Sequence, residues 1–216
     1  CHNPDTWKMG QGQEYTPAEL LKKALRYKNY WGEKGGITVS GGEPLLQIDF
    51  LTELFRKAKA QGIHTTLDTS GNPFTREGER FEKIKKLLEV TDLVMLDIKH
   101  IDPEGHRKLT GQPLEPILAF ARYLDEKAVP VWIRHVVVPG ITYDQNELYR
   151  LGRFIGTLGN VKALDVLPYH DMGKVKYQNL GMDYPLKDTR PLGKDEALAA
   201  KKMILKGIRD ARAGIT

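Results

Sequence analysis

Four short polar segments each follow an apolar stretch of the sequence that is rich in β-branched residues. They are residues 40–43 (SGGE), 68–71 (DTSG), 97–100 (DIKH) and 168–170 (PYH). If the apolar stretches are parallel strands, their carboxyl ends meet at one edge of a sheet, where ligands bind in α/β folds. The four segments therefore indicate one site that combines carboxylates, an ammonium group, an imidazole and a glycine-rich turn.

The third segment carries opposite charges on one face of its predicted strand. Because side chains alternate along a strand, Met95, Asp97 and Lys99 share a face, whereas the other side chains of residues 94–98 are aliphatic. A carboxylate and an ammonium group inside a barrel need partners. They form either a simple ion pair or part of a site for a charged ligand.

The same alternation gives two further charged residues a direction. Asp68 shares its face with His64 and Thr66, and Arg134 shares its face with Trp132. His64 stands at the start of its strand, so we interpret it as structural. Asp68 stands at the end of the strand, where it either binds a ligand or stabilises an Asx-turn.

Two glycines and a histidine complete the polar edge. Gly41 and Gly42 either form a tight turn with positive φ or leave a backbone that a polar ligand can approach. Their place before residues 43–44 (EP) favours the second interpretation. His170, which follows Pro168 and Tyr169, is either structural or part of the site.

The chain begins with CHNPDTW, and Cys1 is its only cysteine. This thiol is either inert or one ligand of a metal-binding motif whose other ligands precede it. A single cysteine excludes an internal disulfide framework, which fits a reducing compartment.

The stretches around the polar segments are predicted to alternate between helices and strands. Residues 16–19 (TPAE) have the form of a capping box with proline at the first helical position, which predicts a helix from about Pro17 toward Trp31. A second helix is predicted over residues 45–62, ending at Gly62. Strands are expected in residues 36–44, 63–70, 92–99, 129–138 and 161–169.

This order of elements predicts an α/β fold. Strands separated by helical stretches long enough for a crossover form parallel sheets with helices on the outside. The 216 residues are fewer than the roughly 250 of a complete eight-stranded barrel. We therefore expect a single domain over residues 1–216 that forms a partial, TIM-like parallel barrel.

Composition excludes several other classes. With 40% hydrophobic and 28% charged residues, the chain can bury one substantial core. Its net charge of +5 is spread along the sequence, so we expect no nucleic-acid partner. No apolar run approaches the ~20 residues that span a bilayer, and no signal segment is visible. We expect no membrane partner and a cytoplasmic location.

Six motifs, in their order and spacing, resemble a known family. They are CHNPDTW, GITVSGGEPLLQ, HTTLDTSG, TDLVMLDIKH, VWIRHVVVPG and LPYHDMGKVKY. Together they are similar to the activating enzymes of glycyl radical enzymes, in the radical S-adenosylmethionine superfamily, and most of all to the subgroup that acts on pyruvate formate-lyase. The resemblance covers nearly the whole chain and implies a partial (β/α)6 barrel.

The resemblance implies two cofactors, a [4Fe-4S] cluster and S-adenosylmethionine. Three cysteines of a CxxxCxxC motif hold the cluster in this family, and Cys1 matches the third. Reductive cleavage of S-adenosylmethionine yields a 5′-deoxyadenosyl radical that abstracts hydrogen from a glycine of the protein substrate, here expected to be pyruvate formate-lyase. A flavodoxin or ferredoxin-type protein is the expected electron donor. The implied cofactor-binding positions are His2, Gly42, Asp97, Lys99, Arg134 and His170.

The resemblance also implies a monovalent cation, K⁺ or Na⁺, beside the carboxylate of S-adenosylmethionine. The matching positions are Asp68, Thr69, Met95 and Asp97. A thioether is a poor ligand for a hard cation, so we expect Met95 to contribute its backbone carbonyl. A cation and a zwitterionic cofactor would account for the opposed charges on one barrel face.

The family pattern extends before Cys1. Its members carry there a first strand, two more cluster cysteines and a DGPG segment. The chain is therefore expected to be truncated at its amino end, to lack the first strand and, with one thiolate, to be inactive as a radical enzyme.

Two functions of other classes stay open. An aldolase or isomerase could use Lys99 as a Schiff-base amine beside Asp97. A non-catalytic module could bind S-adenosylmethionine without a cluster.

Overall fold

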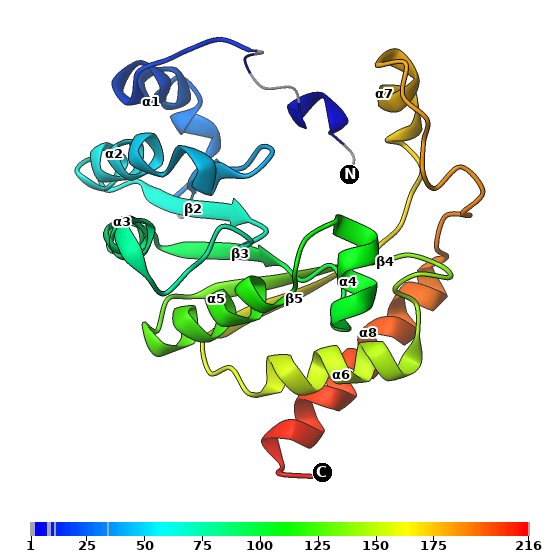
Figure 1. Ribbon diagram of the computed structural model, residues 1–216. Helices are drawn as coiled ribbons and strands as arrows, with labels where there is room; N and C mark the ends of the chain where they lie inside the picture. The colour runs from blue at the N-terminus through cyan, green and yellow to red at the C-terminus, as the bar shows by residue number, and fades with distance from the viewer. Residues whose placement is uncertain (1–2, 8–9, 11, 34, 216) are drawn as a thin grey trace.

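The computed structural model describes residues 3–7, 10, 12–33 and 35–215. Its centre is a five-stranded parallel sheet in which the strand order follows the chain (Figure 1). Each strand lies within a stretch predicted to be one. The strands are β1 (Gly36–Val39), β2 (His64–Thr69), β3 (Leu93–Asp97), β4 (Val131–Val137) and β5 (Val161–Pro168).

The sheet is open. Within the described ranges, β1 and β5 each pair with one neighbour, and all four pairings are parallel. Because every strand lies beside its successor, the connecting helices cross over the same outer face, and α2, α3, α5 and α6 cover it (Figure 1). The predicted α/β class and partial barrel are confirmed.

Two short helices of the 3₁₀ form lie near the predicted site. The first, η1 (Pro4–Trp7), lies near the chain start, and η3 (Pro44–Gln47) follows the glycine-rich segment. None of the helices in the described part of the chain is both long and apolar enough to cross a membrane. The α-helices are α1 (Pro17–Leu25), α2 (Ile48–Lys59), α3 (Gly78–Leu88), α4 (Pro103–Thr110), α5 (Glu115–Glu126), α6 (Gln145–Gly156), α7 (Lys174–Asn179) and α8 (Lys194–Arg212).

The predicted capping box at the start of α1 is present, but the helix is shorter than expected. Thr16 Oγ1 accepts from Glu19 N at 3.3 Å, and Glu19 Oε2 accepts from Thr16 N at 2.9 Å. The α-helix ends at Leu25 and a 3₁₀ turn, η2 (Lys28–Tyr30), follows. Residues 26–30 are all exposed, so no buried face stabilises a helix over this stretch.

The core lies between the sheet and its outer helices. Val94, Leu96 and Ile98 are fully buried, as the alternation along β3 predicts. The helix predicted over residues 45–62 begins with the 3₁₀ turn η3, continues as α2 and meets Gly62, whose φ of +68° ends it. The charged side chains lie on the opposite, inner face of the sheet, together with Met95 and Trp132.

Helices α6 and α8 touch through their backbones. A Cβ atom on Gly152 would stand 2.1 Å from the carbonyl oxygen of Ile204, and one on Gly207 would stand 2.3 Å from that of Tyr149. Two helices can approach this closely only where neither carries a side chain. We call Gly152 and Gly207 the glycine seam; it joins α8 to the helix that follows β4.

Candidate functional site

The carboxyl ends of β2, β3 and β4 bring four charged side chains together. Asp97 Oδ1 accepts from Arg134 Nε at 2.9 Å, and Asp97 Oδ2 accepts from Lys99 Nζ at 2.6 Å. Arg134 Nη2 also donates to Asp68. The strand register accounts for this arrangement, because Asp97 lies opposite Arg134 and Asp68 lies opposite Met95. We call Asp68, Asp97, Lys99 and Arg134 the charged cluster.

Burial shapes the electrostatics of the charged cluster. The side chains of Asp68, Asp97 and Arg134 are each 19% exposed, and that of Lys99 is 39% exposed. Burial raises the pKa of Asp68, and Arg134 offsets only part of this shift. Burial alone would lower the pKa of Arg134, but its two carboxylate partners outweigh it and raise that pKa. A charged ligand therefore meets Lys99 first, since it is the most exposed member.

Glu43 ties two of the polar segments together, a role that the sequence analysis missed. Its Oε1 accepts from Thr69 Oγ1 at 2.6 Å and from Leu45 N at 3.0 Å. Its Oε2 accepts from Ser70 N at 3.0 Å and from Ser70 Oγ at 2.6 Å. The carboxylate thus fixes the turn after β1 against the end of β2. The available signal was an acidic residue directly after two glycines at a strand end.

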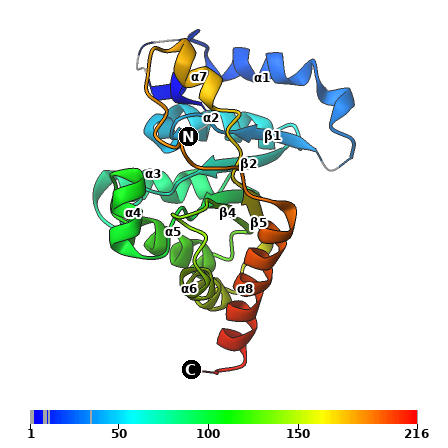
Figure 2. The same cartoon turned by 90° about the vertical axis from the view of Figure 1, so that its right-hand side faces the viewer.

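Gly42 faces the amino-terminal segment. A Cβ atom there would lie 3.3 Å from the carbonyl oxygen of Thr6 in η1. The same segment packs against α7, where the rings of Trp7 and Tyr177 meet edge to face at 5.9 Å (Figure 2). The turn η1, which contains Thr6, therefore lies beside the glycine-rich turn. Cys1 and His2 themselves lie outside the described residues.

The predicted cation ligands are only partly assembled. Thr69 Oγ1 donates to Glu43 and accepts from Gly71 N at 3.0 Å, so only one lone pair of this oxygen remains for a cation. Arg134 supplies the positive charge between Asp68 and Asp97 in this structure. Within the described ranges, no group of three or more His, Cys, Asp or Glu side chains could hold a metal ion.

The remaining predicted residues take clear positions. His170 lies two residues after the end of β5, at the same edge of the sheet as the charged cluster. His64 opens β2 at the opposite end, with Nδ1 3.4 Å from Thr66 Oγ1, which agrees with its structural interpretation. Trp132 is 38% exposed and lies opposite Met95 on the inner face. Met95 and Trp132 each stand two residues before a member of the charged cluster, Asp97 and Arg134, so the inner face is apolar at this point.

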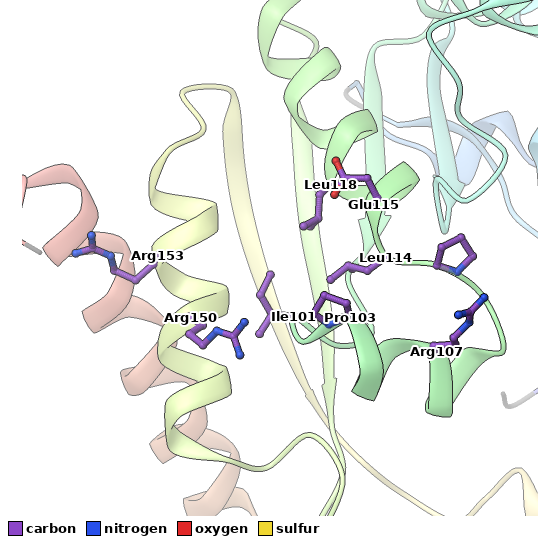
Figure 3. Close-up of a pocket in the computed structure, with 9 residues that line it drawn as sticks. Ile101, Pro103, Arg107, Leu114, Glu115, Leu118, Arg150 and Arg153 are labelled. Carbon is purple, nitrogen blue, oxygen red and sulfur yellow. The ribbon is translucent and has the colours of Figure 1, made fainter.

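A groove of considerable volume lies elsewhere. It encloses about 650 Å³ among α4, α5 and α6 on the outer side of the molecule (Figure 3). It contains none of the residues of the charged cluster, so we assign it no part in the site. Its lining residues are Ile101, Pro103, Arg107, Pro113, Leu114, Glu115, Leu118, Arg150 and Arg153.

The chain is similar to known proteins over most of its length. Residues 1–152 match the family model of the radical SAM superfamily. The pyruvate formate-lyase-activating enzyme of Listeria monocytogenes serovar 1/2a is 50% identical over 205 residues, which cover 94% of this chain and 83% of that protein. The enzyme of the same name from Streptococcus mutans is 50% identical over 206 residues, covering 94% of this chain and 78% of that protein.

Solved structures share the fold. A domain of pyruvate-formate lyase-activating enzyme from Bacteroides vulgatus superposes with a TM-score of 0.64 at 24% identity, covering 80% of this chain and 94% of that one. A radical SAM methyltransferase from Sphaerobacter thermophilus has a TM-score of 0.64 at 15% identity, covering 92% of this chain and 57% of that one. At these identities the likeness shows the fold alone, whereas the family match extends over most of the sequence. The chain belongs to the radical SAM superfamily.

Proposed function

We propose that the chain is an activating enzyme whose protein substrate is pyruvate formate-lyase and that it abstracts hydrogen from a glycine of that partner. The observation that carries the proposal is 50% identity, over 94% of the chain, to an enzyme of that name. The family implies S-adenosylmethionine and a [4Fe-4S] cluster, which supply a 5′-deoxyadenosyl radical when bound. The chain's own task is to bind, orient and shield.

The charged cluster suits the amino acid part of S-adenosylmethionine. Lys99 offers an exposed ammonium group for a carboxylate, held at 2.6 Å from Asp97. Gly41 has a φ of 142° and nothing within 4 Å of the position where a Cβ atom would stand, so its backbone is open to a polar group. We assign Gly42, Asp97, Lys99, Arg134, His170 and His2 to this cofactor.

The residues that would hold the [4Fe-4S] cluster fit less well. The sequence has one cysteine, and a [4Fe-4S] cluster in this family takes three thiolates. Cys1 is our proposed ligand, and it lies outside the described residues. We assign no step of the reaction to the [4Fe-4S] cluster.

Four finer assignments are part of the proposal. The electron donor is a flavodoxin or ferredoxin-type protein, because one-electron reduction must come from outside the chain. The location is cytoplasmic, and residues 1–216 act as one domain. A monovalent cation binds at Asp68, Asp97 and the backbone carbonyls of Thr69 and Met95, supported by two carboxylates at the ends of neighbouring strands.

We do not carry the two other functions forward. In a Schiff-base aldolase Lys99 would attack as a neutral amine. Here its nitrogen is engaged in a 2.6 Å ion pair with Asp97, and the named relatives are pyruvate formate-lyase-activating enzymes. A module that only binds S-adenosylmethionine is not what the named relatives indicate.

The test compares two forms of the protein. One is the 216-residue chain, and the other is extended before Cys1 so that two more cysteines complete the CxxxCxxC spacing. After anaerobic reconstitution, we expect one [4Fe-4S] per chain in the extended form and much less in the shorter one. With reductant and S-adenosylmethionine, the extended form should produce a glycyl radical on pyruvate formate-lyase, measured by electron paramagnetic resonance.

Cys1→Ser in the extended form is the matched control and should abolish both signals. A full cluster on the 216-residue chain would contradict the role of Cys1. A radical formed only on a different glycyl radical enzyme would keep the reaction and refute the substrate.

Asp97→Asn tests the cation. The extended form loaded with the [4Fe-4S] cluster is used. We expect the affinity of wild type for S-adenosylmethionine to differ among potassium, sodium and a large organic cation. Asp97→Asn should weaken this binding about tenfold and remove the difference among the cations. Isothermal titration calorimetry measures both. Asp49→Asn, which removes a surface carboxylate paired with Lys83, is the charge-matched control. Wild-type affinity that is equal in all three cations would refute the cation site.

A further inference from the structure

The chain leaves the sheet at Ile98, the residue between Asp97 and Lys99. β3 ends at Asp97, and the next residue, Ile98, still donates its N–H to the carbonyl oxygen of Arg134 at 3.0 Å. The carbonyl group of Ile98 is instead held by a side chain: His135 Nδ1 lies 2.7 Å from it. Both backbone polar groups of Ile98, its N–H and its carbonyl, are therefore fixed by two consecutive residues of β4.

The chemistry of this contact sets the tautomer of His135. A carbonyl oxygen only accepts hydrogen bonds, so Nδ1 carries the proton and Nε2 carries the lone pair. His135 is 4% exposed, and its Nε2 is buried without a hydrogen bond in the described part of the chain. An aliphatic side chain would fill this place without burying an unpaired nitrogen. The contact with Ile98 is thus the one polar contact that accounts for an imidazole here.

A second histidine holds the turn that follows. His100 Nδ1 accepts from Asp102 N at 3.0 Å, and its ring packs so closely on Gly105 that a Cβ atom there would stand 2.6 Å away. Lys99 therefore lies between Ile98, whose carbonyl group is held by His135, and His100, whose buried ring holds the turn.

We propose that His135 is a positioning residue for the charged cluster: its Nδ1–H fixes the Ile98 peptide and thereby sets the direction of Asp97 and Lys99. Ile98 lies between these two residues, so rotation of its peptide unit would turn Lys99 away from Asp97. The role of His135 in cofactor binding rests on the proposed function. Its effect on the direction of Lys99 does not rest on that function.

The test uses two amides that differ in reach. Asn places its side-chain N–H near the position of His Nδ1, whereas the amide of Gln reaches the position of Nε2. We expect His135→Asn to keep the bond to Ile98 and His135→Gln to lose it. Val137→Ala is the control, because Val137 is fully buried on the same outer face of β4 and makes no side-chain hydrogen bond.

The first measurement is the rate at which Lys99 is acetylated, followed by peptide mass spectrometry in the folded 216-residue protein. Loss of one hydrogen bond corresponds to roughly fivefold, so we expect about fivefold faster labelling in His135→Gln and a rate near wild type in His135→Asn and Val137→Ala. Urea unfolding reports global stability, which Val137→Ala should also lower. Equal labelling in His135→Gln and wild type, or equal acceleration in Val137→Ala, would overturn the proposal.

The second measurement uses the extended, active form. The KM for S-adenosylmethionine should rise about fivefold in His135→Gln, with kcat little changed, and His135→Asn should restore it. An unchanged KM in His135→Gln would refute the role in cofactor binding. If wild type shows no turnover, the proposed function fails, and the Lys99 labelling still decides the positioning role.

Discussion

Replacing Arg134 with Leu is expected to lower the free energy of unfolding by about 3 kcal/mol at pH 7. The guanidinium group bridges Asp68 and Asp97, and all three side chains are only one-fifth exposed. Without it, two carboxylates at the ends of neighbouring strands face each other with Lys99 as the single nearby cation. Urea unfolding of the variant and wild type measures the loss.

The pH dependence of this loss has a definite sign. Burial already raises the pKa of Asp68, and removing Arg134 raises it further. A carboxyl group whose pKa is higher in the folded than in the unfolded state costs stability as the pH rises through that pKa. The difference between Arg134→Leu and wild type should therefore be largest at neutral pH and smaller near pH 4.

Arg76→Leu is the matched control. Arg76 also pairs with a carboxylate, that of Glu126, but the two side chains are 44% and 52% exposed. Surface ion pairs contribute about 0–1 kcal/mol, so this variant should lose little. Equal losses in the two variants would show that the charged cluster is no more than a surface ion pair.

Acid is expected to destabilise the fold through His135. Burial lowers the pKa of His135 to about 4, from 6.5, and the hydrogen bond to Ile98 offsets only part of this shift. The nearby charges are Lys99 and His100, which lower the pKa, and Asp97, which raises it. Between these two pKa values the unfolded chain binds the proton and the folded chain does not. Stability is therefore full above about pH 6.5 and falls as the pH falls toward 4.

The expected loss from this residue is about 2 kcal/mol between pH 7 and pH 5. Burial also lowers the pKa of His106, which adds a loss of the same sign. Urea unfolding at closely spaced pH values measures the slope in wild type and in His135→Asn, which cannot be protonated at this site. A slope in His135→Asn as steep as in wild type would contradict this account.

Sequence periodicity was sufficient to predict the strands of the sheet. The β-branched runs mark all five strands, and the alternation along residues 94–98 separates a charged face from an aliphatic one, because a period of two is a local property. The length of α1 was wrong, because its end depends on which side chains find a buried surface. That surface comes from elements distant in the sequence.

The charged cluster was predicted in part. The pairing of Asp97 with Lys99 was one of two interpretations, since the two residues share a face. That Arg134 bridges Asp97 to Asp68 depends on the register between β3 and β4, which no local pattern encodes. Glu43 was missed for the same reason, because its partners Thr69 and Ser70 lie 26 and 27 residues further along the chain.

The glycine seam limits how this protein can change over evolutionary time. Most helix contacts tolerate substitution because a larger side chain on one helix can be matched by a smaller one on the other. At Gly152 and Gly207 the opposing atoms are main-chain oxygens, which no substitution can shrink. We therefore expect α6 and α8 to be inherited or exchanged only as a pair, so a chimera that takes α8 from a relative without its α6 should fail to dock it.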